Sequence, residues 1–208
     1  MNEPSGCQVR LSHRLAGSGG SASAQELVVV EVDGGIRSYD VGDRPVLDGY
    51  GPNEMCSGGR GQILAPWPNR LRDGQFEWQG HQYQTPLTQP DEHNAIHGLV
   101  RWSAWDVAES GRDHARLEHR LHPQPGWPWT LDFSVTYLLS DAGIEVRMAV
   151  VNASPAELGD CPFGVGWHPY IAAFGGLVDD IVLTVPAGEG YKSDDRGLPV
   201  GRFSVDGT

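Results

Sequence analysis

Basic residues are scarce in this sequence. Its 208 residues include 15 lysines and arginines against 27 aspartates and glutamates, so the formal net charge is −12. Nucleic acids and anionic membrane surfaces are bound by clustered Lys and Arg, and this deficit argues against both. No run approaches about 18 consecutive apolar residues, the length that a transmembrane helix needs. We therefore expect neither a nucleic-acid partner nor a membrane partner.

Cysteine is also scarce. Cys7, Cys56 and Cys161 are odd in number and far apart, so they offer neither a fully paired disulfide framework nor a CxxC metal motif. We expect free thiols in a reducing compartment; a nucleophile formed by Cys161 with His168 is the less favoured alternative. The N-terminus has no basic stretch followed by an apolar one, which a secretory signal requires. These features predict a cytoplasmic protein.

Long amphipathic stretches are missing as well. The 28 glycines and 15 prolines recur too often for long helices, and the apolar residues repeat with a period near 2, which is typical of strands. Short segments separated by turns, at a spacing of about 8–12 residues, indicate an all-β antiparallel sandwich or barrel. The expected strands are 27–32, 36–41, 75–83, 102–109, 115–121, 131–139, 144–152 and 180–185.

The chain shows no internal repeat and no interdomain linker. Residues 1–25 are rich in Ser, Gly and Ala and predict a loose arm or an irregular hairpin. Residues 26–208 are expected to form one β-sandwich domain. Near the end, the segment 194–199 (DDRGLP) indicates a turn, after which no segment is expected to close a sheet. The late acids are expected to be solvated: Asp179, Asp180, Asp194 and Asp195.

Three irregular segments combine polar with aromatic residues. In 58–74, Asn69 and Arg70 offer amide and guanidinium groups that suit sugar hydroxyls, carboxylates or phosphates; surface pairing of this arginine with a neighbouring acid is the alternative. In 93–102, His97 precedes a glycine and a predicted strand; a purely structural role is its alternative. In 164–170, His168 lies between aromatics and before a proline, which favours extended backbone. Histidine is the default general acid or base near neutral pH.

Histidine pairs raise the question of a metal. His93 and His97 are four residues apart, and His119 and His122 are three apart, spacings that share a face on a helix. Neither pair lies in a helical pattern, and on a strand a three-residue spacing places the rings on opposite faces. We therefore expect no metal. The glycine-rich stretch 17–20 is not followed by the Lys-Ser/Thr of a phosphate-binding loop, and no organic cofactor is expected.

These segments, in this order, resemble the aldose 1-epimerase (galactose mutarotase-like) family, especially its short bacterial branch. The matching stretches are GRGQILAPWPNRLRDGQF (59–76), NAIHGLVRW (94–102), HPQPGWPWTLDFSVTY (122–137) and GWHPYI (166–171). An isolated NR or HG pair would carry no information, but the ordered set is specific. The resemblance implies an all-β supersandwich and the interconversion of the α and β anomers of hexoses without metal or organic cofactor.

Mutarotation needs one base and one acid. The base removes the proton of the anomeric hydroxyl while the acid protonates the ring oxygen, and the hemiacetal opens to an aldehyde that recloses on its other face; each group contributes about 10²–10⁴-fold. By the resemblance, Asn69, Arg70 and His97 would bind sugar hydroxyls and the ring oxygen. His97 and His168 would be the catalytic imidazoles, with His168 as the general acid.

The sequence departs from the family pattern at its C-terminal end. The family takes its base from a late glutamate and a further sugar contact from a late aspartate, and no residue before the terminal VDGT matches either by motif. We therefore expect a sandwich incomplete at the C-terminus and weak or absent activity. The alternatives are a non-catalytic carbohydrate-binding protein and an epimerase for sugar phosphates. Arginines suggest the latter: Arg60, Arg70, Arg72 and Arg101. No oligomeric state is predicted.

Overall fold

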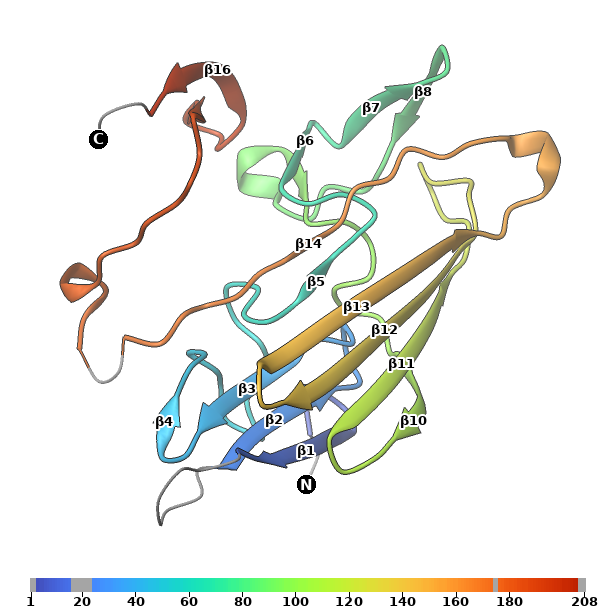
Figure 1. The fold of residues 1–208 in the computed structure, drawn as a ribbon. Coiled ribbons are helices and arrows are strands. Elements are labelled where there is room, and N and C mark those ends of the chain that lie inside the picture. Colours follow the sequence, from blue (N-terminus) through green and yellow to red (C-terminus); the bar gives the residue numbers. More distant parts are fainter. Residues whose placement is uncertain (1–2, 16–23, 174–175, 206–208) are drawn as a thin grey trace.

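The chain folds into two four-stranded antiparallel sheets (Figure 1). The computed structural model describes residues 3–15, 24–173 and 176–205. The first sheet has the strand order β1-β2-β3-β4. Its strands are β1 (Gln8–Arg14), β2 (Ala24–Val30), β3 (Ile36–Val41) and β4 (Arg44–Pro45). β1 pairs with β2 along its whole length, from Gln8 opposite Val30 to Arg14 opposite Ala24.

The second sheet has the order β10-β11-β12-β13. Its strands are β10 (Asp106–Ser110), β11 (His114–Leu121), β12 (Leu131–Ser140) and β13 (Gly143–Asn152). β12 and β13 pair from Leu131 opposite Asn152 to Ser140 opposite Gly143, around a tight turn. Every second residue of β12 is buried, as expected for a strand with one face on the core.

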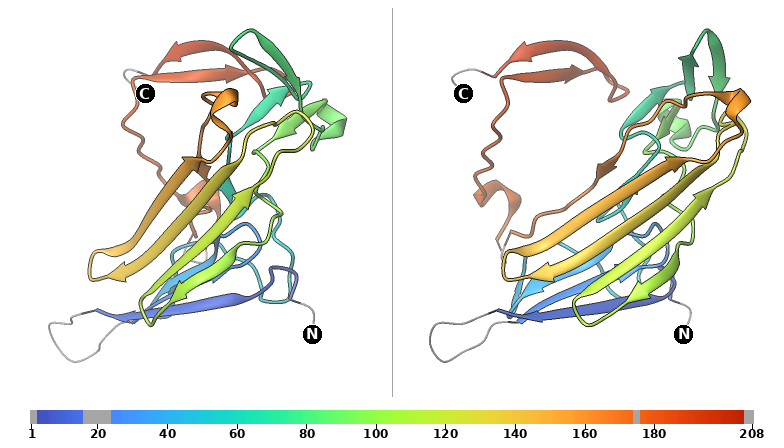
Figure 2. Two further views of the ribbon diagram at one scale, coloured as in Figure 1. Left: turned by 90° about the vertical axis from the view of Figure 1, so that its right-hand side faces the viewer. Right: turned by 45° about the vertical axis from the view of Figure 1, so that its right-hand side comes forward.

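The core lies between the two sheets. β1 contacts β11 and β12 at the crossing of the sheets, and Figure 2 shows the first sheet running below the second. Burial of each large apolar side chain contributes about 1.5–3 kcal/mol. The buried hydroxyl of Tyr137 donates to the carbonyl of Gly34 at 2.6 Å, which ties β12 to the turn after β2. The fully buried large side chains include Trp105, Trp127, Trp129, Tyr137, Leu11, Leu27 and Leu117.

Short strand pairs cover one end of the sandwich. β5 (Ile63–Leu64) pairs with β14 (Gly166–Trp167), and β6 (Arg70–Arg72) pairs with β9 (Asn94–Ile96). β7 (Gln75–Trp78) and β8 (His81–Gln84) form a hairpin. Single turns of 3₁₀ helix occur at η1 (Pro90–Glu92), η2 (Ala156–Leu158) and η3 (Val178–Asp180). No helix in the described ranges is long and apolar enough to cross a membrane.

The C-terminal hairpin, β15 (Glu189–Ser193) with β16 (Pro199–Ser204), stands apart from the two sheets in Figure 1. Its turn nevertheless docks on the β6–β9 region. The Arg196 guanidinium donates to the carbonyls of Glu92 and His93 at 2.8 and 2.6 Å and to the Asp73 carboxylate at 2.7 Å. Leu198 is buried next to this anchor. The turn is therefore a fixed part of the structure.

The predicted all-β antiparallel sandwich is confirmed, with corrections to single elements. The strand expected at 180–185 is wrong: Val182 and Leu183 are 91% and 81% exposed, and this segment pairs with no described strand. The strand expected at 75–83 is a hairpin with its turn at Gln79 and Gly80, and that expected at 102–109 begins only at Asp106. The hairpin β15–β16 was not expected.

The range 1–25, for which a loose arm or an irregular hairpin was predicted, contains β1 and the first two residues of β2. These strands pair in the first sheet. Residues 16–23 of that range lie outside the described residues.

Candidate functional site

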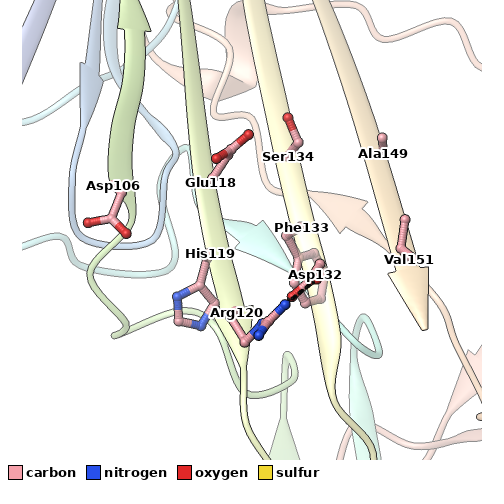
Figure 3. Close-up of a pocket in the computed structure, with 9 residues that line it drawn as sticks. All are labelled: Asp106, Glu118, His119, Arg120, Asp132, Phe133, Ser134, Ala149 and Val151. Carbon is pink, nitrogen blue, oxygen red and sulfur yellow. Dashed lines mark hydrogen bonds and ion pairs between the residues drawn. The ribbon is translucent and has the colours of Figure 1, made fainter. Parts of the chain in front are cut away.

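One hollow lies on the face of the second sheet that points away from the core (Figure 3). Its volume is about 370 Å³, and charged side chains of β11 and β12 line it. These charges are already paired: Arg120 donates to both carboxylate oxygens of Asp132 at 2.6 and 2.7 Å, and Glu118 pairs with Arg116. None of the residues that the sequence predicts for the site lies here. We interpret this hollow as an ion-paired sheet surface.

The predicted residues converge instead around the segment 61–65. On one side of it, His168 continues from β14, and its backbone N–H donates to the carbonyl of Gln62 at 3.1 Å. On the other side, Gly98 bridges Ala65, and the N–H of Leu99 donates to the Ala65 carbonyl at 2.7 Å. This central segment therefore holds two distant parts of the chain together. The rings of His97 and His168 lie 5.4 Å apart between centroids, edge to face at 86°.

Left-handed backbone conformations shape the His97 side of the site. His97 has φ = 64° and Asn69 has φ = 62°, and Asn is among the residues that tolerate this region best. The two residues exchange hydrogen bonds: the His97 N–H donates to the Asn69 carbonyl at 2.7 Å, and the Asn69 N–H donates to His97 Nδ1 at 3.0 Å. A Cβ on Gly98 would overlap the Ala65 carbonyl, so only glycine fits next to this histidine.

The bond from Asn69 fixes the chemistry of the His97 ring. Because Nδ1 accepts a hydrogen bond, the proton of the neutral imidazole is on Nε2. Burial, together with the positive charges of Arg101, His168 and Arg70, lowers the pKa of His97 to about 4. At neutral pH, His97 is therefore an uncharged ring that presents Nε2–H as a hydrogen-bond donor.

Arg70 is held in place by uncharged groups. Its Nε donates to Gln89 Oε1 at 2.8 Å, and its Nη1 donates to Asn69 Oδ1 at 3.1 Å. The alternative of a surface ion pair with Asp73 is not what the structure shows, because Asp73 pairs with Arg196. Gly197 of the C-terminal turn lies directly against the guanidinium, since a Cβ there would be 2.9 Å from Arg70 Cζ. The candidate sugar-binding arginine thus rests against a turn that is far from it in sequence.

A stack of three side chains supports His168. Its ring stacks on Tyr170 with 5.2 Å between centroids, and Arg60 Cζ lies over the Tyr170 ring, 4.5 Å from its centroid. The Tyr170 hydroxyl donates to the Gly58 carbonyl at 3.1 Å, and Arg60 donates to Asp48. This stack orients the imidazole.

Arg101 is bound to the central segment through Gln62. Its Nε donates to Gln62 Oε1 at 2.8 Å, and Gln62 Nε2 donates back to the Arg101 carbonyl at 3.0 Å. Gln62 is completely buried, as is the neighbouring Asp33, whose pKa burial raises well above its usual value. With Trp67, Trp102 and others, Arg101 lines a hollow of about 280 Å³; Ile96 and Gly98, which flank His97 in sequence, line it too.

The late acids do not reach the imidazoles. Asp194 accepts backbone N–H groups of its own turn and forms an exposed ion pair with Arg72 at 3.3 Å. Asp180 caps η3 through the Leu177 N–H at 3.2 Å. Within the described ranges, no aspartate or glutamate pairs with His97 or His168, and no three metal-ligating side chains gather.

Sequence reasoning missed several residues of this site. Gln62, Gln89 and Gly197 carry no recognisable signal, because an amide or a glycine is common in any loop. Tyr170 was noted only as an aromatic neighbour of His168, although its stacking on that ring is a short-range relation. The missed contacts of Gly197 join residues more than a hundred positions apart, and no local pattern reports such a contact.

Comparisons with known proteins identify relatives of this chain. The family model for aldose 1-epimerase matches residues 23–206. The uncharacterized protein YihR of Escherichia coli (strain K12) is 30% identical over 187 residues, which are 89% of this chain and 60% of YihR. A stretch of 110 residues is 32% identical to the uncharacterized protein YphB of the same organism, covering 51% of this chain and 35% of YphB. The chain therefore spans about 60% or less of these relatives.

Solved structures show the same fold. A galactose mutarotase-like protein from Clostridium acetobutylicum superposes with a TM-score of 0.70 at 21% identity, over 93% of this chain and 64% of that one. Galactose 1-epimerase from Lactobacillus acidophilus NCFM also reaches 0.70, at 18% identity, over 97% of this chain and 64% of that one. The galactose mutarotase-like sandwich expected from the sequence is confirmed. The family model spans most of the chain, and on that ground the chain belongs to the aldose 1-epimerase family.

Proposed function

We propose that this chain binds the pyranose ring of a hexose at the two imidazoles and acts on its anomeric centre as a mutarotase. The observation that carries the proposal is the edge-to-face pair of His97 and His168, with the neutral His97 presenting Nε2–H. Asn69 and Arg70, which hydrogen-bond to each other beside this pair, supply further groups for sugar hydroxyls.

The roles of the two imidazoles differ. With its pKa lowered to about 4, His97 is neutral at pH 7 and holds a sugar oxygen through a hydrogen bond. His168 lies on the other side, oriented by Tyr170, and serves as the general acid that protonates the ring oxygen as the ring opens. The proton of the anomeric hydroxyl leaves at the same time, and reclosure of the aldehyde on its other face gives the second anomer.

The base for that proton is the missing component in the described part of the chain. No described carboxylate pairs with either imidazole, and we assign the base to none of the described residues. With solvent water as the proton acceptor, we expect the acceleration to be small. The same observation favours the second candidate, a carbohydrate-binding protein without catalysis. Both candidates require the sugar to bind at His97 and His168.

Two measurements on the intact chain separate these functions. Calorimetric titration with glucose and galactose reports binding, and NMR exchange spectroscopy of the anomeric protons reports the interconversion rate. His168→Gln removes the acid, whereas His81→Gln alters an exposed histidine of β8 as the matched control. We expect saturable binding with wild type and with H81Q, and a rate above the spontaneous one that H168Q reduces to background.

Each outcome decides between the candidates. Saturable binding with no acceleration supports the non-catalytic function. Acceleration that H168Q leaves unchanged rejects the assigned acid. Absence of binding by both sugars, at concentrations well above those of the protein, rejects binding of neutral hexoses.

A further inference from the structure

The second sheet ends in a long strand with an open edge. β13 is the last strand in the order β10-β11-β12-β13, and among the described residues it pairs as a strand only with β12 (Figure 1). Edge strands avoid pairing with another chain by short length, bulges, lysine or proline. β10, at the other edge, is five residues long and bulged. β13 is ten residues long, regular in its pairing, and contains neither lysine nor proline.

The hydrogen-bond pattern determines which residues face the open edge. Directly after β13, the Ala153 N–H donates to the Thr130 carbonyl at 2.9 Å, in step with the pairing of β13 and β12. Because the main-chain groups of successive residues in a strand point to opposite sides, the odd-numbered residues of β13 bond to β12. The even-numbered residues therefore direct their N–H and C=O groups to the open edge, among them Ile144, Val146 and Met148.

The side chains of β13 complement a second copy of the same strand in one register. With an antiparallel pair related by a two-fold axis at Val146, Glu145 of each copy lies opposite Arg147 of the other on the outward face. On the inner face Ile144 lies opposite Met148, and Val146 lies opposite its counterpart. An axis at Glu145 or Arg147 would place like charges opposite each other, which is unfavourable in a sheet. An axis at Met148 would leave both charges opposite apolar residues.

The side chains that this register would cover are accessible. Those of Arg147 and Glu145 are 72% and 48% exposed, and Val146 is 42% exposed although it is on the inner face. The overlap of residues 143–149 would form about six main-chain hydrogen bonds between the copies. It ends before Asn152, whose side chain donates to the Gly159 carbonyl at 3.0 Å. The pairing therefore uses the part of β13 that precedes this contact.

We propose that two copies of this chain associate through β13 about a two-fold axis at Val146, which joins their second sheets into one continuous sheet. Such a contact is isologous, since the same strand serves both partners. The exposed segment 180–185 is also rich in β-branched residues, but it has no basic side chain to meet Glu145. A second copy satisfies both charges of the strand. The inference is independent of hexose binding.

Sedimentation velocity over a concentration series tests this association with the intact chain. E145R places arginines opposite each other and R147E places glutamates opposite each other, so each should weaken dimerisation at least about tenfold. The double variant E145R/R147E inverts both pairs and should restore the dimer to within about threefold of wild type. Arg202→Glu is the matched control, because Arg202 is 64% exposed and pairs with Glu189 within the C-terminal hairpin. It should leave dimerisation unchanged.

Cysteine cross-linking reports the register. In an oxidised mixture of E145C and R147C, the two positions face each other about 4.5 Å apart between Cα atoms, and a heterodimer should be trapped. In either variant alone the two cysteines lie about 7–8 Å apart, and cross-linking should not exceed that of wild type, which has the exposed Cys7.

The outcomes that overturn the inference are distinct. A monomer at every concentration excludes the dimer, and a dimer that R147E leaves intact places the contact away from β13. Dissociation by V182K/L183K but not by R147E would assign the contact to the segment 180–185. Failure of the double variant to restore association rejects the axis at Val146.

Discussion

Gly197→Ala should displace Arg70, from which it is 127 residues distant in sequence but with which it is in contact. Gly197 has φ = 72°, and an added Cβ would lie 2.9 Å from both Cζ and Nη1 of Arg70. Since the guanidinium is the flexible end of its side chain, it would move and lose its hydrogen bonds at 2.8 and 3.1 Å. The substitution therefore acts through two separable effects, backbone strain in the turn and displacement of the candidate sugar-binding arginine.

Gly80→Ala isolates the first effect. Gly80 has φ = 79°, but an added Cβ would meet nothing within 4 Å. Strain at a left-handed position costs about 1 kcal/mol in both variants. Two displaced hydrogen bonds add about 1–2 kcal/mol in Gly197→Ala alone. If Arg70 holds the sugar, the displacement also weakens hexose binding by about tenfold, because about 1.4 kcal/mol corresponds to a factor of ten.

Urea unfolding and calorimetric titration with hexose provide the assay. Each glycine variant is measured in the wild-type background and in an Arg70→Ala background, where the extra cost of Gly197→Ala should vanish. The reasoning is refuted if the two glycine variants are equally stable and bind hexose equally well. It is also refuted if the extra cost persists without the arginine.

Two further predictions follow from the same structure. His97→Asn keeps a residue that tolerates φ = 64° and an acceptor for its partner's N–H, but removes the titrating ring. The folded pKa of about 4 lies below the usual 6.5, so the unfolded chain takes up a proton first as pH falls. The stability that neutral His97 contributes is present above pH 6.5 and is lost as pH falls toward 4. Subtracting the unfolding free energies of H97N from those of wild type at pH 7 and pH 5 should show this loss, and a pH-independent difference would contradict it. Val182→Lys combined with Leu183→Lys should reduce aggregation, because these side chains are 91% and 81% exposed. Light scattering during concentration measures the effect, and unchanged aggregation would place its origin elsewhere.

The sequence predicted the strands that follow simple alternation. β12 and β13 are a hairpin of ten-residue strands with a two-residue turn, and their pattern is local. The expectation for 180–185 failed because β-branched composition does not make a strand without a partner to pair with. The turn at 194–199 was located correctly, but its docking through Arg196 was not foreseen, because a turn rich in charge is usually solvated.

The candidate site was predicted by family resemblance more than by residue chemistry. Nothing in the sequence indicates that His97 and His168 are in contact. Taken alone, His97 favoured a structural role, and His168 was a default candidate for a general acid or base. Their meeting depends on the backbone of 61–65, which pairs on both sides. The tautomer of His97 depends on one hydrogen bond from Asn69 and required the structure.

The arrangement around the segment 61–65 has a consequence for the order of folding. The hairpins β1–β2 and β12–β13 close between neighbouring strands, so each can form soon after its own residues are synthesised. The two imidazoles meet only when this segment finds β14, as in the bond from the Trp167 indole to the Gly61 carbonyl across 106 residues. The pair of imidazoles therefore depends on a contact of high sequence separation, and such contacts cost more chain entropy to form than those within the hairpins.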